Sequence, residues 1–318
     1  MKWDKIMTVA QPIDPEILPF ASEFAAQMSE PGLSVHESRA RYAELLTQQG
    51  DPETPVATKD MEIPTRHGSV GARLYTPKDP RPALLVYMHG GGFVVGGLDS
   101  LEVPLHALSH DAGVSVLSLD YALAPENMYP IALEQCQDAL LWVEQNRKEL
   151  GGTRHLAVGG DSAGGNIAAM LAHWARDNNA AQLDWQVLIN PVLDFPAVDA
   201  AGTESHGLYG DSPMLNTEAM KGFNQLYFKD EKAKIGASPL LSDDLSGLPP
   251  AFIAAAECDA LRDDSIAYAK KLADHGTPAD LTVYEGMTHN FLVLTHASRT
   301  SRKFLSDLIE ATTAWART

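Results

Sequence analysis

The chain has 318 residues, 45% of them hydrophobic, and its 24 basic and 42 acidic side chains give a formal net charge of −18. This charge repels phosphate backbones and anionic bilayers, so we expect no nucleic acid and no membrane surface as partner. The apolar content is ample for a large core, and no linker or repeat divides the chain, so we expect one main domain with a small cap.

The start of the chain, Met1-Lys2-Trp3-Asp4-Lys5, has an early acidic residue and no apolar segment of a signal peptide after it. No stretch approaches 18 uninterrupted apolar residues. We therefore expect a soluble, cytoplasmic protein. The two cysteines, Cys136 and Cys258, are too few for a disulfide framework and belong to no Cys/His cluster, so both are expected to pack as small buried hydrophobes.

Two amphipathic helices are predicted within residues 1–50. Residues 15–29 carry apolar side chains at helical spacing, namely Ile17, Phe20, Ala21, Phe24, Ala25 and Met28. Ser34 and Glu37 form a capping-box pattern that opens a second helix through Leu46. Because this segment precedes the strand-rich region, we expect it to cover the domain as part of the cap rather than to enter the sheet.

The following residues predict a sheet. Met61–Thr65 and Ala72–Thr76 flank a turn at residues 66–69 and predict an antiparallel hairpin at a sheet edge. Later apolar runs alternate with helix-like stretches: Ala83–Met88, Val114–Leu119, Leu156–Val158, Val187–Ile189, Phe252–Ala256 and Leu281–Tyr284. This alternation is typical of an α/β fold, with a mostly parallel sheet covered by helices on both faces. The main α/β domain is assigned to residues 51–190 and 245–318, and its functional site is expected at the carboxyl ends of the strands.

Residues 191–244 interrupt this alternation and are predicted to be a cap insertion. They contain no strong strand pattern, but Phe223, Leu226 and Tyr227 stand at the i, i+3 and i+4 positions of one helical face. Such a stripe more often packs a helix onto a core than contacts a ligand. Both interpretations stay open here: packing of the cap onto the core, and direct contact with an acyl chain.

Two glycine-rich segments follow predicted strands. His89-Gly90-Gly91-Gly92-Phe93 follows the run that ends at Met88, and Gly160-Asp161-Ser162-Ala163-Gly164-Gly165 follows the run that ends at Val158. The first predicts backbone N–H donors for an oxyanion hole, from Gly91 and Gly92 together with Ala163. The second predicts a nucleophilic Ser162 on a tight strand-to-helix turn, although a serine N-cap is the alternative for this segment alone.

A serine nucleophile needs a histidine base, and the histidine needs a carboxylate to orient it. In the order Ser, Asp or Glu, His, the base follows the last strands, which leaves His275, His289 and His296. His289 follows the predicted strand Leu281–Tyr284 and a short loop, whereas His275 precedes Gly276 as at a helix end. His296 falls in a later helical or loop stretch, and His89 is expected to orient backbone rather than to transfer protons.

The carboxylate is expected at the end of the strand before His289. Asp259 is the first aspartate after the run Phe252–Ala256 and is our preferred acid, with Glu257 as the second candidate. Asp263 and Asp264 are better explained as acidic residues in the first turn of a helix, where they interact favourably with the helix dipole.

These motifs together resemble the hormone-sensitive-lipase family of α/β-hydrolases, the bacterial carboxylesterase group. The segments that carry the resemblance are His89–Phe93, Asp120–Glu126, Gly160–Gly165, Asp259–Asp263 and Gly286–Phe291. The resemblance covers most of residues 55–317. It implies an α/β-hydrolase fold with a helical cap, a triad of Ser162, Asp259 and His289, and oxyanion donors at Gly91, Gly92 and Ala163. One departure is Ala122, where such sequences commonly have an arginine; no catalytic role is affected.

The expected activity is that of a serine carboxylesterase acting on small esters of short to medium acyl chains, through an acyl-enzyme and without metal or organic cofactor. A homodimer through a sheet edge is suggested by family analogy alone. Because free imidazole has a pKa near 6.5, activity is expected to rise through roughly pH 6 to 7. The alternatives are a ligand-binding protein on the same fold and an amidase.

Overall fold

A computed structural model describes residues 10–30 and 32–318. The segment Met1–Lys5, read above for an export signal, lies outside this range. Within it, no helix is long and apolar enough to cross a membrane. The strands are β1 Ala57–Thr65, β2 Gly68–Thr76, β3 Ala83–Met88, β4 Ser115–Asp120, β5 His155–Asp161, β6 Trp185–Ile189, β7 Ala251–Ala256 and β8 Ala279–Tyr284.

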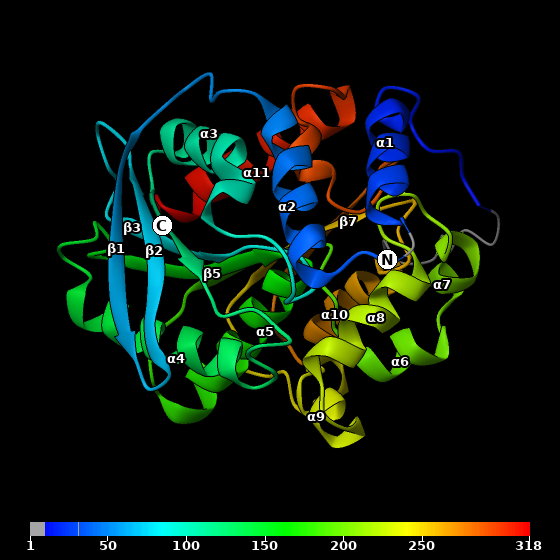
Figure 1. Cartoon of the computed structure of the whole chain (residues 1–318). Helices are drawn as coiled ribbons and strands as arrows, with labels where there is room; N and C mark the ends of the chain where they lie inside the picture. The colour runs from blue at the N-terminus through cyan, green and yellow to red at the C-terminus, as the bar shows by residue number, and fades with distance from the viewer. Residues whose placement is uncertain (1–9, 31) are drawn as a thin grey trace.

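In the described residues, these strands form one sheet in the order β1-β2-β4-β3-β5-β6-β7-β8. β1 pairs with β2, and β2 with β4, in antiparallel fashion, and all other pairs are parallel. The expected hairpin therefore lies at the sheet edge, on the left of Figure 1. Its strands are longer than predicted and its turn is shorter, because β1 already begins at Ala57 and β2 already begins at Gly68, which pairs with Thr65.

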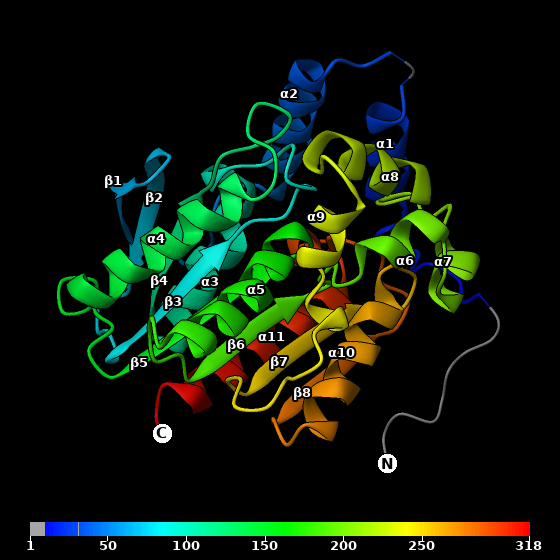
Figure 2. The same cartoon turned by 90° about the horizontal axis from the view of Figure 1, so that it is seen from below.

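Helices cover both faces of the sheet, as the strand–helix alternation predicts. In Figure 2, α4 and α5 lie in front of the strands, and α3 and α11 lie behind them. The strands β3, β5, β6 and β7 are buried along their whole length, which explains their continuous apolar runs. The helices of these two layers are α3 Glu102–Ala112, α4 Ile131–Asn146, α5 Ala163–Asn178, α10 Arg262–Asp274 and α11 Arg299–Trp315.

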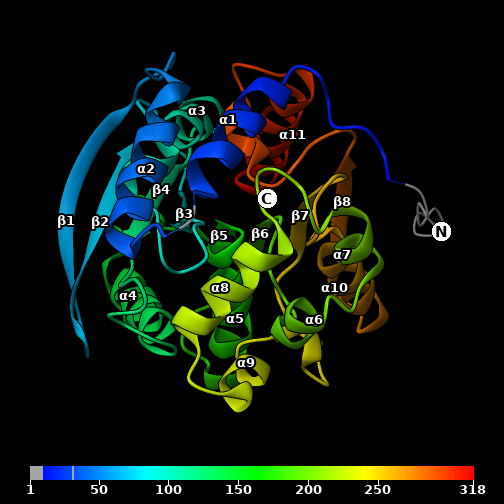
Figure 3. The ribbon, with the colours of Figure 1, turned by 45° about the vertical axis from the view of Figure 1, so that its right-hand side comes forward.

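The remaining helices gather at one end of the sheet (Figures 2 and 3). Two precede the sheet, α1 Leu18–Met28 and α2 Val35–Leu46, close to the predicted ranges. The capping box of α2 forms as expected, because Glu37 Oε2 accepts the Ser34 N–H at 2.9 Å and Ser34 Oγ accepts the Glu37 N–H at 3.2 Å. Residues 191–244 contain α6 Phe195–Ala200, α7 Glu204–Tyr209, α8 Thr217–Tyr227 and α9 Glu231–Gly236.

Candidate active site

Ser162 lies between the end of β5 and the start of α5, in a backbone conformation that non-glycine residues rarely adopt (φ 54°, ψ −118°). A Cβ at Gly164 would collide with the backbone of Met88 and His89, so only glycine allows α5 to approach β3 this closely. Ser162 precedes α5, but its side chain caps no backbone N–H of that helix. The N-cap alternative is therefore wrong for the hydroxyl.

The three predicted catalytic side chains form a continuous chain of hydrogen bonds. Ser162 Oγ lies 2.8 Å from His289 Nε2, and His289 Nδ1 lies 2.7 Å from Asp259 Oδ2. All three residues are buried, although they are up to 127 positions apart in the sequence. With the imidazole proton on Nδ1, Asp259 accepts that N–H, and Nε2 is free to accept the serine proton.

The competing residues lie elsewhere. Glu257 Oε2 accepts the backbone N–H of Gly286 at 2.9 Å instead of a histidine proton. His275 ends α10, with its Nδ1 2.8 Å from the carbonyl oxygen of Lys271, as the helix-end interpretation predicts. His296 lies in the turn between the short helix Phe291–Leu294 and α11.

The glycine-rich loop after β3 needs its glycines for backbone conformation and for space. Gly91 and Gly92 have φ of 120° and 59°, and a Cβ on Gly92 would collide with the ring of Phe223. Within the described residues, the backbone N–H groups of Gly91, Gly92 and Ala163 donate to no protein acceptor. All three residues line the same cavity as Ser162. Unpaired backbone N–H groups beside a nucleophile are what an oxyanion requires.

His89 and Asp161 both hydrogen-bond to the backbone of Gly90 in this loop. His89 stacks on Tyr121, with ring centroids 4.4 Å apart, and its Nδ1 lies 2.7 Å from the Gly90 carbonyl oxygen. Burial lowers its pKa to about 4, so the ring is neutral at neutral pH. This environment agrees with a backbone-orienting role.

Asp161 is a site residue to which the sequence analysis assigned no role. Its Oδ1 accepts the Gly90 N–H at 3.0 Å and the Tyr87 hydroxyl at 3.1 Å, which connects the glycine-rich loop to the end of β5, directly before Ser162. Burial raises the pKa of this carboxyl to about 6, against the opposing effect of the Tyr87 hydrogen bond. The available signal was an acidic residue at a strand end, immediately before the predicted nucleophile Ser162.

A cavity of about 450 Å³ opens beside Ser162 and His289. This volume lies within the range of small-molecule sites. Its wall is largely apolar, and much of it comes from α1, α8 and the segment before α8. The apolar lining includes Phe24, Met28, Met214, Met220, Phe223 and Leu226.

The three apolar side chains on one face of α8 have different surroundings, and each of the two interpretations given above holds for part of them. Phe223 and Leu226 line the cavity, as contact with a ligand requires. Tyr227 is buried and stacks on Phe93, with centroids 3.9 Å apart and planes 5° apart, as packing onto the core requires. One helical face thus serves both purposes.

The interpretation of Asp264 as a dipole partner is incomplete. Asp264 does stand in the first turn of α10, but it is buried, and its Oδ2 accepts the backbone N–H of Leu193 at 2.7 Å and of Asp194 at 3.2 Å. Burial raises its pKa to about 7. Asp263 likewise accepts the Ser205 N–H at 2.8 Å. Both carboxylates connect α10 to residues after β6.

Comparisons with known proteins show the family to which this chain belongs. Residues 85–293 match a family model described as alpha/beta hydrolase fold. The chain is 36% identical to the carboxylic ester hydrolase LipN of Mycobacterium tuberculosis, over 88% of this chain and 77% of that protein. It is also 36% identical to the ethyl acetate hydrolase of Pseudomonas putida, over 82% and 84% of the two chains.

Solved structures give the same result. A hyperthermophilic esterase from the archaeon Pyrobaculum calidifontis superposes with a TM-score of 0.89 at 33% identity, over 97% of this chain and all of the other. The family match spans well over half of the chain, and the curated relatives exceed 30% identity over most of it. The chain belongs to the hormone-sensitive-lipase or carboxylesterase group of the α/β-hydrolases.

Proposed function

We propose that this protein hydrolyses carboxylic esters of short to medium acyl chains, with Ser162 as nucleophile, His289 as general base and Asp259 as the acid that orients the imidazole. The observation that carries the proposal is the unbroken hydrogen-bond chain from Ser162 Oγ through both ring nitrogens of His289 to Asp259 Oδ2. A hydroxyl in this arrangement loses its proton as it attacks, which makes it a competent nucleophile.

The reaction follows from the placement of these groups. Ser162 Oγ attacks the ester carbonyl carbon while its proton passes to His289 Nε2, and the carbonyl oxygen becomes an oxyanion that accepts the N–H groups of Gly91, Gly92 and Ala163. The protonated imidazole then gives its proton to the leaving alcohol, which leaves an acyl-enzyme. Water, deprotonated by the same imidazole, releases the acid and regenerates the serine.

The substrate class follows from the cavity. Its apolar wall favours an acyl chain, and its volume of about 450 Å³ suits a short to medium chain better than an insoluble triglyceride. The relatives named for ester and ethyl acetate hydrolysis support the same bond type.

The proposal is tested with Ser162→Ala and a series of p-nitrophenyl esters from acetate to palmitate. We expect the wild type to turn over acetate to octanoate best, and the variant to lose a factor on the order of 10⁶ in kcat, by analogy with serine hydrolases. Unchanged ester cleavage by the variant would exclude Ser162 as nucleophile. Faster cleavage of a matched anilide than of the ester by the wild type would favour an amidase.

A further inference from the structure

The loop that carries Asp259 is held by two serines from the insertion between β6 and β7. Ser205 Oγ donates to the carbonyl oxygen of Ala260 at 2.6 Å, and Ser212 Oγ donates to that of Cys258 at 3.0 Å. These carbonyls belong to the residues immediately after and before Asp259. Both serines are buried, with 0% and 6% of their surface exposed, so water does not replace either hydroxyl easily.

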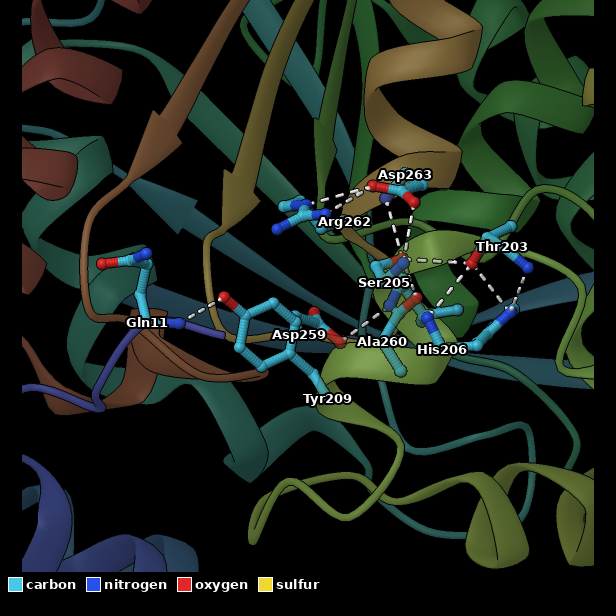
Figure 4. Close-up of polar contacts among 10 residues, drawn as sticks. Gln11, Thr203, Ser205, His206, Tyr209, Asp259, Ala260, Arg262 and Asp263 are labelled. Atoms are coloured by element: carbon cyan, nitrogen blue, oxygen red, sulfur yellow. Dashed lines mark hydrogen bonds and ion pairs between the residues drawn. The ribbon is translucent and has the colours of Figure 1, made fainter. Parts of the chain in front are cut away.

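Ser205 is itself fixed to the start of α10. Its backbone N–H donates to Asp263 Oδ2 at 2.8 Å, and its Oγ accepts the backbone N–H of Asp263 at 3.3 Å. Figure 4 shows Ser205 between Ala260 and Asp263, with Thr203 on its other side. The serine therefore connects α7 to both ends of the short segment from Ala260 to Asp263.

Helix α7 has little freedom to carry Ser205 away. The hydroxyl of Tyr209, at its end, accepts the backbone N–H of Gln11 at 3.0 Å, and the Arg262 guanidinium lies 5.4 Å from the centroid of the Tyr209 ring. Arg262 also forms an ion pair with Asp263, in which Nη2 lies 3.0 Å from Oδ1. The helix is thus attached to the N-terminal segment on one side and to α10 on the other.

The carboxylate of Asp259 depends on the position of this loop. Its Oδ1 accepts the Leu261 N–H at 3.0 Å and its Oδ2 lies 2.7 Å from His289 Nδ1, so both oxygens are used. Without the serine donors, the carbonyls of Cys258 and Ala260 would be buried and unpaired, and the loop would move to satisfy them. A displacement of about 1 Å at a reacting constellation can cost 100-fold in rate.

We propose that Ser205 and Ser212 are positioning residues, which set the place of the Asp259 carboxylate and thereby the orientation of His289. This inference rests on the proposed role of Asp259. Neither serine lines the cavity, so their effect is on the chemical step and not on substrate binding.

The experiment compares Ser205→Ala and Ser212→Ala with the control Ser265→Ala, measured with p-nitrophenyl butyrate on enzyme counted by titration with a serine-reactive phosphonate. Ser265 is fully buried on α10, and within the described residues its hydroxyl has no hydrogen-bond partner. We expect kcat to fall by about 10- to 100-fold for Ser205→Ala, somewhat less for Ser212→Ala, with KM within twofold. The control should stay within twofold of wild type in both constants.

A double-mutant cycle separates positioning from general stability. Asp259→Asn should lower kcat by about 10⁴-fold, and adding Ser205→Ala to it should cost no further factor, because the serine acts only through the acid. The inference is wrong if Ser205→Ala keeps wild-type kcat, or if its loss persists in the Asp259→Asn background. Full activity of Asp259→Asn alone would instead overturn the proposed function.

Folding is controlled with Ser205→Cys, which fills the site with a side chain of the same shape and slightly larger volume but donates a much weaker hydrogen bond. A low kcat in this variant, at an unchanged melting temperature, supports positioning. Recovery of wild-type kcat would show that only the filled volume matters and would overturn it.

Discussion

Asp259 and Glu257 show how two carboxylates at neighbouring places in the sequence acquire different partners. Asp259 bonds the imidazole of His289, whereas Glu257 accepts the backbone N–H of Gly286 in the loop before the histidine. The spacing along the sequence left both residues as candidates for the acid that orients His289, because each lies just after β7. Their different directions from the backbone decide which one reaches His289.

This difference predicts unequal effects of two conservative substitutions. Asp259→Asn keeps the shape but cannot stabilise the imidazolium, so kcat is expected to fall by about 10⁴-fold. Glu257→Gln keeps an acceptor for Gly286 and should leave kcat within a few-fold of wild type. Steady-state kinetics on both variants checks this, and a reversed order of the two losses would assign the acid to Glu257.

At the scale of elements, α8 is both part of the cavity wall and a support for the loop that carries the proposed oxyanion donors Gly91 and Gly92. Phe223 closes over Gly92 and lines the cavity, while Tyr227 stacks on Phe93 at the end of the same loop. A shift of this helix would therefore change the space for the acyl chain and the loop position together.

The two aromatic residues are expected to separate specificity from stability. Phe223→Ala removes cavity wall and should move the preferred p-nitrophenyl ester toward longer chains, with a modest change in melting temperature. Tyr227→Ala removes a fully buried stacked ring and should lower the free energy of unfolding by about 3–5 kcal/mol. Chain-length profiles and urea denaturation test the pair; an unchanged profile for Phe223→Ala would remove this side chain from the acyl site.

At the scale of the whole molecule, buried carboxyl groups make the stability depend on pH. Burial raises the pKa of Asp161 to about 6 and of Asp264 to about 7, above the usual value near 3.9 for an exposed aspartate. Between the usual pKa near 3.9 and the raised pKa of each group, the folded state binds more protons than the unfolded state. Each group therefore lowers the free energy of unfolding as pH rises, by at most about 1.4 kcal/mol per pH unit.

Asp264→Asn should remove one of these contributions and still offer an oxygen to the N–H groups of Leu193 and Asp194. The free energy of unfolding of the variant relative to wild type is expected to grow between about pH 4 and 7 and to level off above pH 7. Urea denaturation of both proteins at pH 4 to 8 measures this difference. A constant difference across the range would show that Asp264 does not titrate there.

The sequence alone predicted the sheet with its two helical layers, and it singled out Ser162, His289 and Asp259, which the structure joins by hydrogen bonds. These features are local: apolar runs mark buried strands, and the chemical groups stand directly after them, where parallel strands bring their carboxyl ends to one edge. The capping box of α2 and the glycine loop were predictable for the same reason, since their residues interact within a few positions.

Only the tertiary structure decided which contacts join distant segments. Ser205 reaches Ala260 across 55 positions, Asp264 reaches Leu193 across 71, and Phe223 and Tyr227 differ in role only through what α8 faces. The spacing of residues along the sequence does not predict such pairings, because the partner of a side chain depends on how whole helices and strands pack. The burial that shifts the pKa of Asp161 and Asp264 arises from the same packing.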